Sequence, residues 1–175
     1  MSVRDDPGRG RLVLVTGTDA AARVALGTAI AARLAHAVVV DGAALERLVR
    51  VAPVGASDAP EDGGRDEAWS GAPTPEQLMA RLLRWSAALA VAEVHQLEGH
   101  DAVVIEEATG ERLADLLDLL DPEPVHVVVI ADGLDATTPR WGLWVAGTDP
   151  VDTTAVGLVA RLDEALVETA GPVGT

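Results

Sequence analysis

Short apolar runs alternate with amphipathic stretches along most of the chain. The runs consist mainly of Val, Leu and Ile, whereas in the longer stretches apolar residues recur every four positions, as at Leu26, Ile30 and Leu34. Uninterrupted apolar runs are typical of parallel strands covered on both faces, and the recurrence is typical of helices. The runs predict strands at residues 11–16, 37–40, 101–106, 125–130 and 141–146. The recurrences predict helices at residues 21–34, 43–51, 74–99, 111–120 and 149–168.

This alternation predicts an α/β fold with three layers, α/β/α, in which helices cover both faces of a five-stranded parallel sheet. A chain of 175 residues is expected to form a single domain, residues 1–175. Residues 1–10 are polar and predict a tail. Residues 52–74 are rich in Pro, Gly, Ala, Asp and Glu, which predicts a mobile acidic loop that is either a functional lid or disordered.

Acidic side chains dominate the charge of the chain. The formal net charge is −15, and all 13 basic residues are arginines dispersed along the sequence. This balance argues against nucleic acids and anionic membranes as partners. The absence of cysteine excludes disulfides and thiolate chemistry, and no pair of histidines has metal-ligand spacing, so we expect neither a metal nor a cofactor. With no signal peptide and no run long enough to span a membrane, we expect a soluble, cytoplasmic protein.

The turn between the first strand and the first helix has the position of a phosphate-binding loop. The template G-x-x-x-x-G-K-[ST] cradles phosphates with backbone N–H groups, a lysine and a magnesium-binding hydroxyl. Gly17 fits the first glycine, and Thr18 follows it. Ala22, Arg23 and Val24 stand where the second glycine, the lysine and the hydroxyl belong. With these replacements the loop keeps its position between a strand and a helix but lacks the groups that bind phosphate.

The altered loop has two interpretations. Asp19 adds a negative charge to a loop that should attract an anion, so together with the three replacements it makes tight binding of Mg-ATP unexpected. The helix N-terminus still offers some attraction for a small anion or a carboxylate. Alternatively, residues 17–24 are an ordinary connection between a strand and a helix.

Further segments follow one another in an order that resembles a known family. They are residues 38–42 (Val-Val-Val-Asp-Gly), 81–86 (Arg-Leu-Leu-Arg-Trp-Ser), 101–107 (Asp-Ala-Val-Val-Ile-Glu-Glu), 109–113 (Thr-Gly-Glu-Arg-Leu) and 124–129 (Pro-Val-His-Val-Val-Val). From about Arg11 to Val167 the chain resembles the chloramphenicol phosphotransferase-like family of P-loop small-molecule kinases. The resemblance implies a five-stranded parallel sheet with flanking helices, and transfer of phosphate from ATP to a hydroxyl of a small molecule.

The resemblance also implies roles for individual residues. Asp41 matches the aspartate that acts as general base after the second strand. Glu106 and Glu107 fall at the end of the third strand, where the family usually has aspartates. The helix that lines the acceptor pocket in the family here carries Arg81, Arg84 and Trp85.

Two features on the ATP side depart from the family pattern. One is the loop, whose lysine, second glycine and hydroxyl are replaced. The other is the arginine-bearing lid after the fourth strand, which is reduced here to about a dozen residues with Arg140 as its single arginine. Residues 145–148 would approach the former site of the nucleotide base. The acceptor side of the family pattern is better kept.

The three carboxylates at the predicted strand ends are the main candidates for catalysis. Asp41, Glu106 and Glu107 would meet at the carboxyl edge of the sheet, where open sheets of this kind bind ligands. Clustered carboxylates split their pKa values, so that one can act as a base while another stays protonated. Alternatively, Asp41 caps the next helix and the glutamates are solvated.

Arg81 and Trp85 share a helix face because they are four residues apart. They could stack as a platform for a ligand. Alternatively, Trp85 is a core residue that the stem of Arg81 covers. Trp69 is the residue that could anchor the acidic loop, and it completes the candidates for substrate binding.

These observations leave three hypotheses for the function. The first is a kinase-fold protein that no longer transfers phosphate and binds a small organic molecule, repurposed for acid–base chemistry such as cyclisation, elimination, isomerisation or hydrolysis in specialised metabolism. The second is an active antibiotic-type phosphotransferase in which Arg23 replaces the lysine and Glu106 or Glu107 holds magnesium. The third is a non-catalytic pseudokinase that serves a partner enzyme. The expected partners are a small-molecule ligand and either further copies of the chain or a protein of the same pathway.

Overall fold

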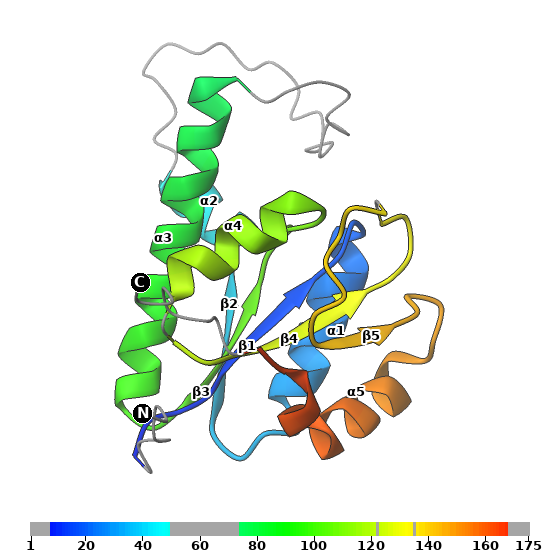
Figure 1. Cartoon of the computed structure of the whole chain (residues 1–175). Helices are drawn as coiled ribbons and strands as arrows, with labels where there is room; N and C mark the ends of the chain where they lie inside the picture. The colour runs from blue at the N-terminus through cyan, green and yellow to red at the C-terminus, as the bar shows by residue number, and fades with distance from the viewer. Residues whose placement is uncertain (1–7, 50–73, 122, 135, 168–175) are drawn as a thin grey trace, which may run out of the picture.

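The computed structural model describes residues 8–49, 74–121, 123–134 and 136–167. A central sheet lies between two layers of helices (Figure 1). As predicted, five strands pair in parallel, in the order β2-β3-β1-β4-β5. Their bounds are Leu12–Thr16 for β1, Ala37–Asp41 for β2, Asp101–Ile105 for β3, Val125–Ile130 for β4 and Leu143–Val145 for β5.

Helices cover both faces of the sheet, so each strand residue meets one layer or the other. In β1, Leu12 and Leu14 face the core formed with α3 and α4, whereas Val13 and Val15 face the core formed with α1 and α5. This strict alternation within an all-apolar run is the arrangement of a sheet buried on both sides. The helices are Ala20–Ala31 (α1), Gly42–Val49 (α2), Pro75–Leu97 (α3), Glu111–Leu120 (α4) and Val151–Ala160 (α5).

The helix predicted over residues 74–99 begins with a capping box. Thr74 accepts a hydrogen bond from the backbone N–H of Gln77, and the Gln77 side chain accepts one from the N–H of Thr74, with Pro75 as the first helical residue. The predicted acidic loop before this helix, residues 52–74, lies outside the described residues apart from Thr74. The predicted tail lies outside them as well, apart from residues 8–10.

The end of the chain differs from the prediction of a helix over residues 149–168. The helix α5 ends at Ala160 and is followed by a 3-10 turn, Leu162–Ala165, and by β6, Leu166–Val167. The reason is the length of β5, which pairs only with Val128–Ile130 and leaves the first part of β4 open. There β6 pairs with it antiparallel and adds a sixth strand to the sheet.

Gly27 explains how closely α1 approaches the sheet. A Cβ atom at this position would lie 2.7 Å from the Ile105 side chain of β3, a distance that side chains do not reach without a shift. A glycine is therefore needed at this position for the close contact between α1 and β3. In the part of the chain that the structure describes, no helix is both long and apolar enough to cross a membrane.

Candidate functional site

The carboxyl edge of the sheet gathers the residues that the sequence singles out. Asp41 ends β2 and stands beside Ile105 in the register with β3, after which Glu106 and Glu107 follow directly. The loop from β1 to α1 lies beside them because β1 is the neighbour of β3. Parallel strands bring their carboxyl ends to one edge, so these placements follow from the topology.

The loop between β1 and α1 is short, because α1 begins as early as Ala20. Only residues 17–19 connect the strand to the helix, and residues 20–24 of the phosphate-loop template lie within the helix. Asp19 is the N-cap of α1: its Oδ1 accepts from the N–H of Ala22 at 2.9 Å, and its carbonyl accepts from the N–H of Arg23 at 3.0 Å. A carboxylate of the chain itself thus occupies the anion position of this helix N-terminus.

Arg23 is folded into the same loop and is only 6% exposed. Its Nη1 donates to the carbonyl of Gly17 at 2.5 Å, and its Nη2 lies 3.7 Å from Oε2 of Glu107. Thr18 holds the loop from the other side, since its Oγ1 donates to the carbonyl of Asp132 after β4. The positive charge at the lysine position of the template is therefore committed to contacts within the protein.

Glu106 is the most deeply buried carboxylate of the site, with 3% of its surface exposed. Its Oε2 forms an ion pair with Nη2 of Arg84 at 3.1 Å, whereas its Oε1 is buried without a hydrogen-bond partner in the structure. Burial raises the pKa of Glu106 to about 7, although the nearby Arg84 acts to lower it. The group can therefore exchange a proton near neutral pH.

Gly42 leaves the space that Glu106 fills. A Cβ atom at Gly42 would collide with Oε1 of Glu106, so any side chain at the start of α2 would displace the carboxylate. Arg84 extends the contact to α2, because its Nη1 donates to Oε2 of Glu46 at 3.3 Å. One arginine thus connects a buried carboxylate to a half-buried one.

Asp41 caps the next helix, which is the alternative interpretation from the sequence. Its Oδ1 accepts from the N–H groups of Ala43 at 3.0 Å and Ala44 at 3.3 Å. A carboxylate oxygen that accepts two backbone N–H groups is held in place as a helix cap. The role of Asp41 as a general base remains a prediction.

Trp85 does not form the proposed platform. It is 2% exposed and belongs to the core between α3 and the sheet, so its ring faces are covered and the core interpretation holds. The side chain of Arg81 lies over this ring, with Cζ 6.0 Å from the ring centroid. Burial and the neighbouring guanidinium groups of Arg112 and Arg84 lower the pKa of Arg81.

Arg112 and Glu46 belong to the site although the sequence assigned neither of them a role. Arg112 acts on Arg81 from the first turn of α4, and Glu46 receives Arg84 from α2. In the sequence, the one feature that could have indicated their role is their position on helices that begin at the carboxyl edge of the sheet. Trp69 lies outside the described residues. Among those residues, no group of three or more side chains could hold a metal ion.

Of two cavities in the described part of the chain, neither is lined by Asp41, Glu106 or Glu107. A cavity of about 380 Å³ lies along α3 and the end of α4, lined by Leu89, Glu93 and Glu123 among others. Near the expected site of a nucleotide base, a cavity of about 10 Å³ is lined by Leu26 and Gly147. That volume holds about one water molecule.

Comparisons with known proteins identify the class of fold. No protein-family model and no curated protein sequence matches the chain. Among solved structures, a mutant of the Mycobacterium tuberculosis APS kinase CysC is similar, with a TM-score of 0.62 and 17% identity over 90% of this chain and 99% of that one. A tunicamycin resistance protein of Deinococcus radiodurans has a TM-score of 0.59 and 13% identity over 92% and 100%.

A sugar kinase from Janibacter is similar as well, with a TM-score of 0.56 and 13% identity over 89% of this chain and 96% of that one. At these identities the comparison establishes the fold alone. The chain has the α/β fold of the P-loop kinases, as its resemblance to the chloramphenicol phosphotransferase-like family implied.

Proposed function

We propose that this protein is a kinase-fold protein that has lost phosphoryl transfer and binds a small organic molecule at the carboxyl edge of its sheet. The observation that carries the proposal is the state of the β1–α1 loop. The carboxylate of Asp19 accepts from the N–H of Ala22 at the helix N-terminus that would face a phosphate, and Arg23 is held by Gly17 and Glu107. The helix N-terminus and the basic side chain, which would bind a phosphate together, thus both have partners within the chain.

A triphosphate would have to displace these contacts in order to bind. A working loop offers backbone N–H groups, a lysine and a hydroxyl that holds magnesium. Here the incoming anion would meet the carboxylate of Asp19, and Val24 offers no oxygen for a metal ion. The cavity near the expected base site has room for about one water molecule. These features favour the first hypothesis over an active phosphotransferase.

Glu106 is the residue we assign to acid–base chemistry. A general acid or base is most effective when its pKa lies near the working pH, and the pKa of Glu106 is about 7. Its Oε1 has no hydrogen-bond partner and lies against Gly42, so a ligand that exchanges a proton with this atom would have to enter the space beside the start of α2. Proton transfer of this kind is a step of cyclisation, elimination, isomerisation and hydrolysis. We propose that the protein catalyses a reaction of one of these types in specialised metabolism. Asp41, which is fixed as a helix cap, is the carboxylate next to Glu106 and would act as its partner in proton transfer.

The proposal is tested with two assays on the full chain. Hydroxyl-bearing compounds, including chloramphenicol, tunicamycin and simple sugars, are screened for a rise in melting temperature, which a ligand of the folded state produces. The same compounds are then incubated with Mg-ATP, and ADP release is measured. Stabilisation by a compound without ADP release supports the proposal. Release of ADP that depends on a compound would overturn it in favour of a phosphotransferase.

A further inference from the structure

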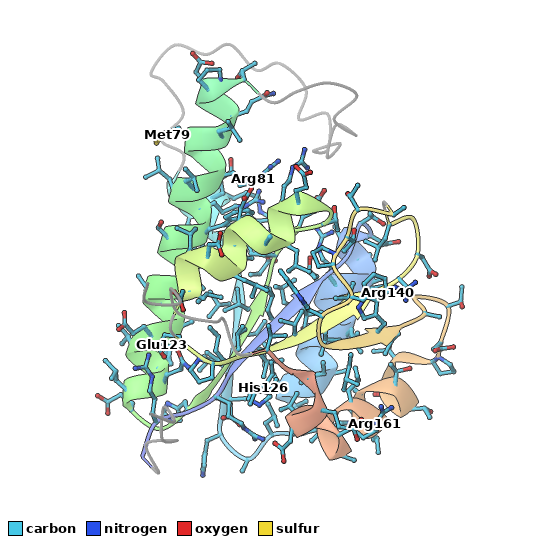
Figure 2. All side chains as sticks on the ribbon, in the orientation of Figure 1. Met79, Arg81, Glu123, His126, Arg140 and Arg161 are labelled. Carbon is cyan, nitrogen blue, oxygen red and sulfur yellow. The ribbon has the colours of Figure 1, made fainter. Side chains whose placement is uncertain are left out.

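The side of α3 that faces away from the sheet is apolar for most of its length. The helix is anchored by its inner side, where Trp85, Ala88 and Ala92 are buried. Between Met79 and Leu97 its opposite side, which we call the outer face of α3, carries no charged residue, since Glu76 on the same side lies before this stretch. Met79 on this face points away from the body (Figure 2). The outer face consists of Met79, Ala80, Leu83, Ala87, Ala90, Val91, Val94 and Leu97, all exposed.

The large side chains of this face are unusually open to solvent. Leu83, Val94 and Leu97 are 64%, 61% and 63% exposed, and Met79 is 58% exposed. Contiguous apolar surface of this extent on a soluble protein marks an interaction site. The face extends about 27 Å from Met79 to Leu97, at 1.5 Å per residue.

The spacing within the face is that of a coiled-coil seam. Apolar residues stand at 80, 83, 87, 90, 94 and 97, alternating steps of three and four, which places them on one stripe facing a partner helix. The stripe matches itself when a second copy runs antiparallel to it. Ala80 then meets Leu97 of the second copy, Leu83 meets Val94, and Ala87 meets Ala90.

In this register the sizes of the facing side chains suit two closely packed helices. Each large residue of the stripe faces an apolar residue, and the central layers contain only alanine, which lets two helices approach closely. The pairing is symmetric about a two-fold axis, so one surface serves both copies, as in most homodimers. With a net charge of −15 per chain, an uncharged face is also where two copies can meet at least electrostatic cost.

From these features we infer that the protein forms a homodimer through antiparallel contact of two α3 helices. The inference is independent of the proposed function, since the outer face and the carboxylate site lie on different sides of the helix. Like-charge repulsion between the copies weakens with screening, so the dimer becomes tighter as salt is added.

The dimer is tested by sedimentation of the full chain between 1 and about 100 μM, concentrations at which a standard interface is populated. Wild type is expected to be a dimer, and Leu83→Glu, at an exposed position, a folded monomer. Val156→Glu, at a position that is 57% exposed on α5, is the matched control and stays a dimer. A monomeric wild type at the highest concentration would overturn the proposal and leave the face to a different protein.

The orientation is tested by cross-linking, because the chain has no cysteine of its own. A mixture of the Ala87→Cys and Ala90→Cys variants is expected to form a disulfide between chains, since these positions face each other. The Ala80→Cys variant alone is the control, because its two copies lie at opposite ends of the seam. A disulfide in the Ala80→Cys variant would show parallel helices and overturn the proposed register.

Discussion

Two adjacent glutamates show how the structure separates residues that look alike in the sequence. Glu106 turns toward α2 and α3, where it is buried against Gly42 and paired with Arg84. Glu107, the next residue, turns toward the β1–α1 loop, is partly exposed and faces Arg23. Successive residues after a strand point to opposite faces, which accounts for the difference. Burial accordingly raises the pKa of Glu106 to about 7.

The raised pKa of Glu106 makes stability depend on pH. The pKa of about 7 in the folded protein lies above the ordinary 4.5, so between these values the folded chain keeps a proton that the unfolded chain releases. Stability is therefore lost as pH rises through this window, by on the order of 3 kcal/mol. We expect Glu106→Gln to remove this loss, so that the variant exceeds wild type at pH 8 but not at pH 4.5.

Urea unfolding at both pH values measures this difference. Glu164→Gln is the control, because Glu164 is exposed and paired with Arg161 on a different element, and it should leave the window unchanged. If wild type and Glu106→Gln lose stability in parallel between the two pH values, the buried ionisation is not as described.

The cap made by Asp41 gives a second test at this scale. Asp41→Ala removes the acceptor for the N–H groups of Ala43 and Ala44, so we expect a loss of about 1 kcal/mol in the free energy of unfolding. Asp41→Asn keeps an acceptor oxygen and should cost much less. Equal losses in the two variants, measured by urea unfolding, would argue for a role of the charge instead.

At the scale of the elements, α1 is fixed at both its start and its middle. Asp19 and Arg23 tie its first turn to the loop, and Gly27 lets it lie close against Ile105 of β3. The helix that would present phosphate-binding groups in a kinase is here locked to the sheet by its own side chains. We therefore expect substitutions in α1 to change the free energy of unfolding.

Gly27 and Gly157 form a matched pair of helical glycines. Replacing a helical glycine with alanine ordinarily gains about 1 kcal/mol. At Gly27 the added methyl group would collide with Ile105, so we expect Gly27→Ala to destabilise by about 1 kcal/mol in net terms. At Gly157 no atom lies within 4 Å of the added group, so Gly157→Ala should stabilise the protein. Melting temperatures of the two variants should therefore move in opposite directions, and a rise in both would contradict the close contact.

Arg23 distinguishes a structural loop from a nucleotide-binding one. Arg23→Ala leaves the carbonyl of Gly17 and the carboxylate of Glu107 without this partner, so we expect a loss of about 2 kcal/mol in the free energy of unfolding. Val24→Ala, at a neighbouring position that is 42% exposed, is the control and should cost little. Chemical denaturation checks both, and an Arg23→Ala variant as stable as wild type would mean that this contact is not structural.

Much of the architecture could be predicted from the sequence, because apolar runs and capping residues are local signals. The strand at Val125–Ile130 and the start of α3 at Thr74 were predicted at their actual bounds. The strand Leu166–Val167 could not be predicted, since it depends on how short β5 is. For Trp85 the spacing to Arg81 fixed a shared helix face but not which face packs on the sheet. The contact of Glu106 with Gly42 likewise needs the pairing of β2 with β3.

At the scale of the whole molecule, the fold is that of a kinase, whereas the contacts of the β1–α1 loop are not those expected of a phosphate-binding loop. The topology and the similar solved structures are those of P-loop kinases. Within that fold, the residues at the position of the phosphate loop contact one another, whereas Glu106 and Arg84 form an ion pair on the other side of β3. A scaffold can thus keep its layers while the chemistry at its edge changes.

The measurement that tests this difference between the fold and the loop most directly is calorimetry of ATP added to the full chain, with magnesium and with magnesium removed by a chelator. Because Asp19 and Arg23 already satisfy the β1–α1 loop, the account predicts no binding heat at millimolar nucleotide in either condition. Magnesium-dependent binding with a Kd below about 1 mM, a free energy near −4 kcal/mol, would contradict it. The loop would then open to a triphosphate, and the protein would have to be assayed as a phosphotransferase.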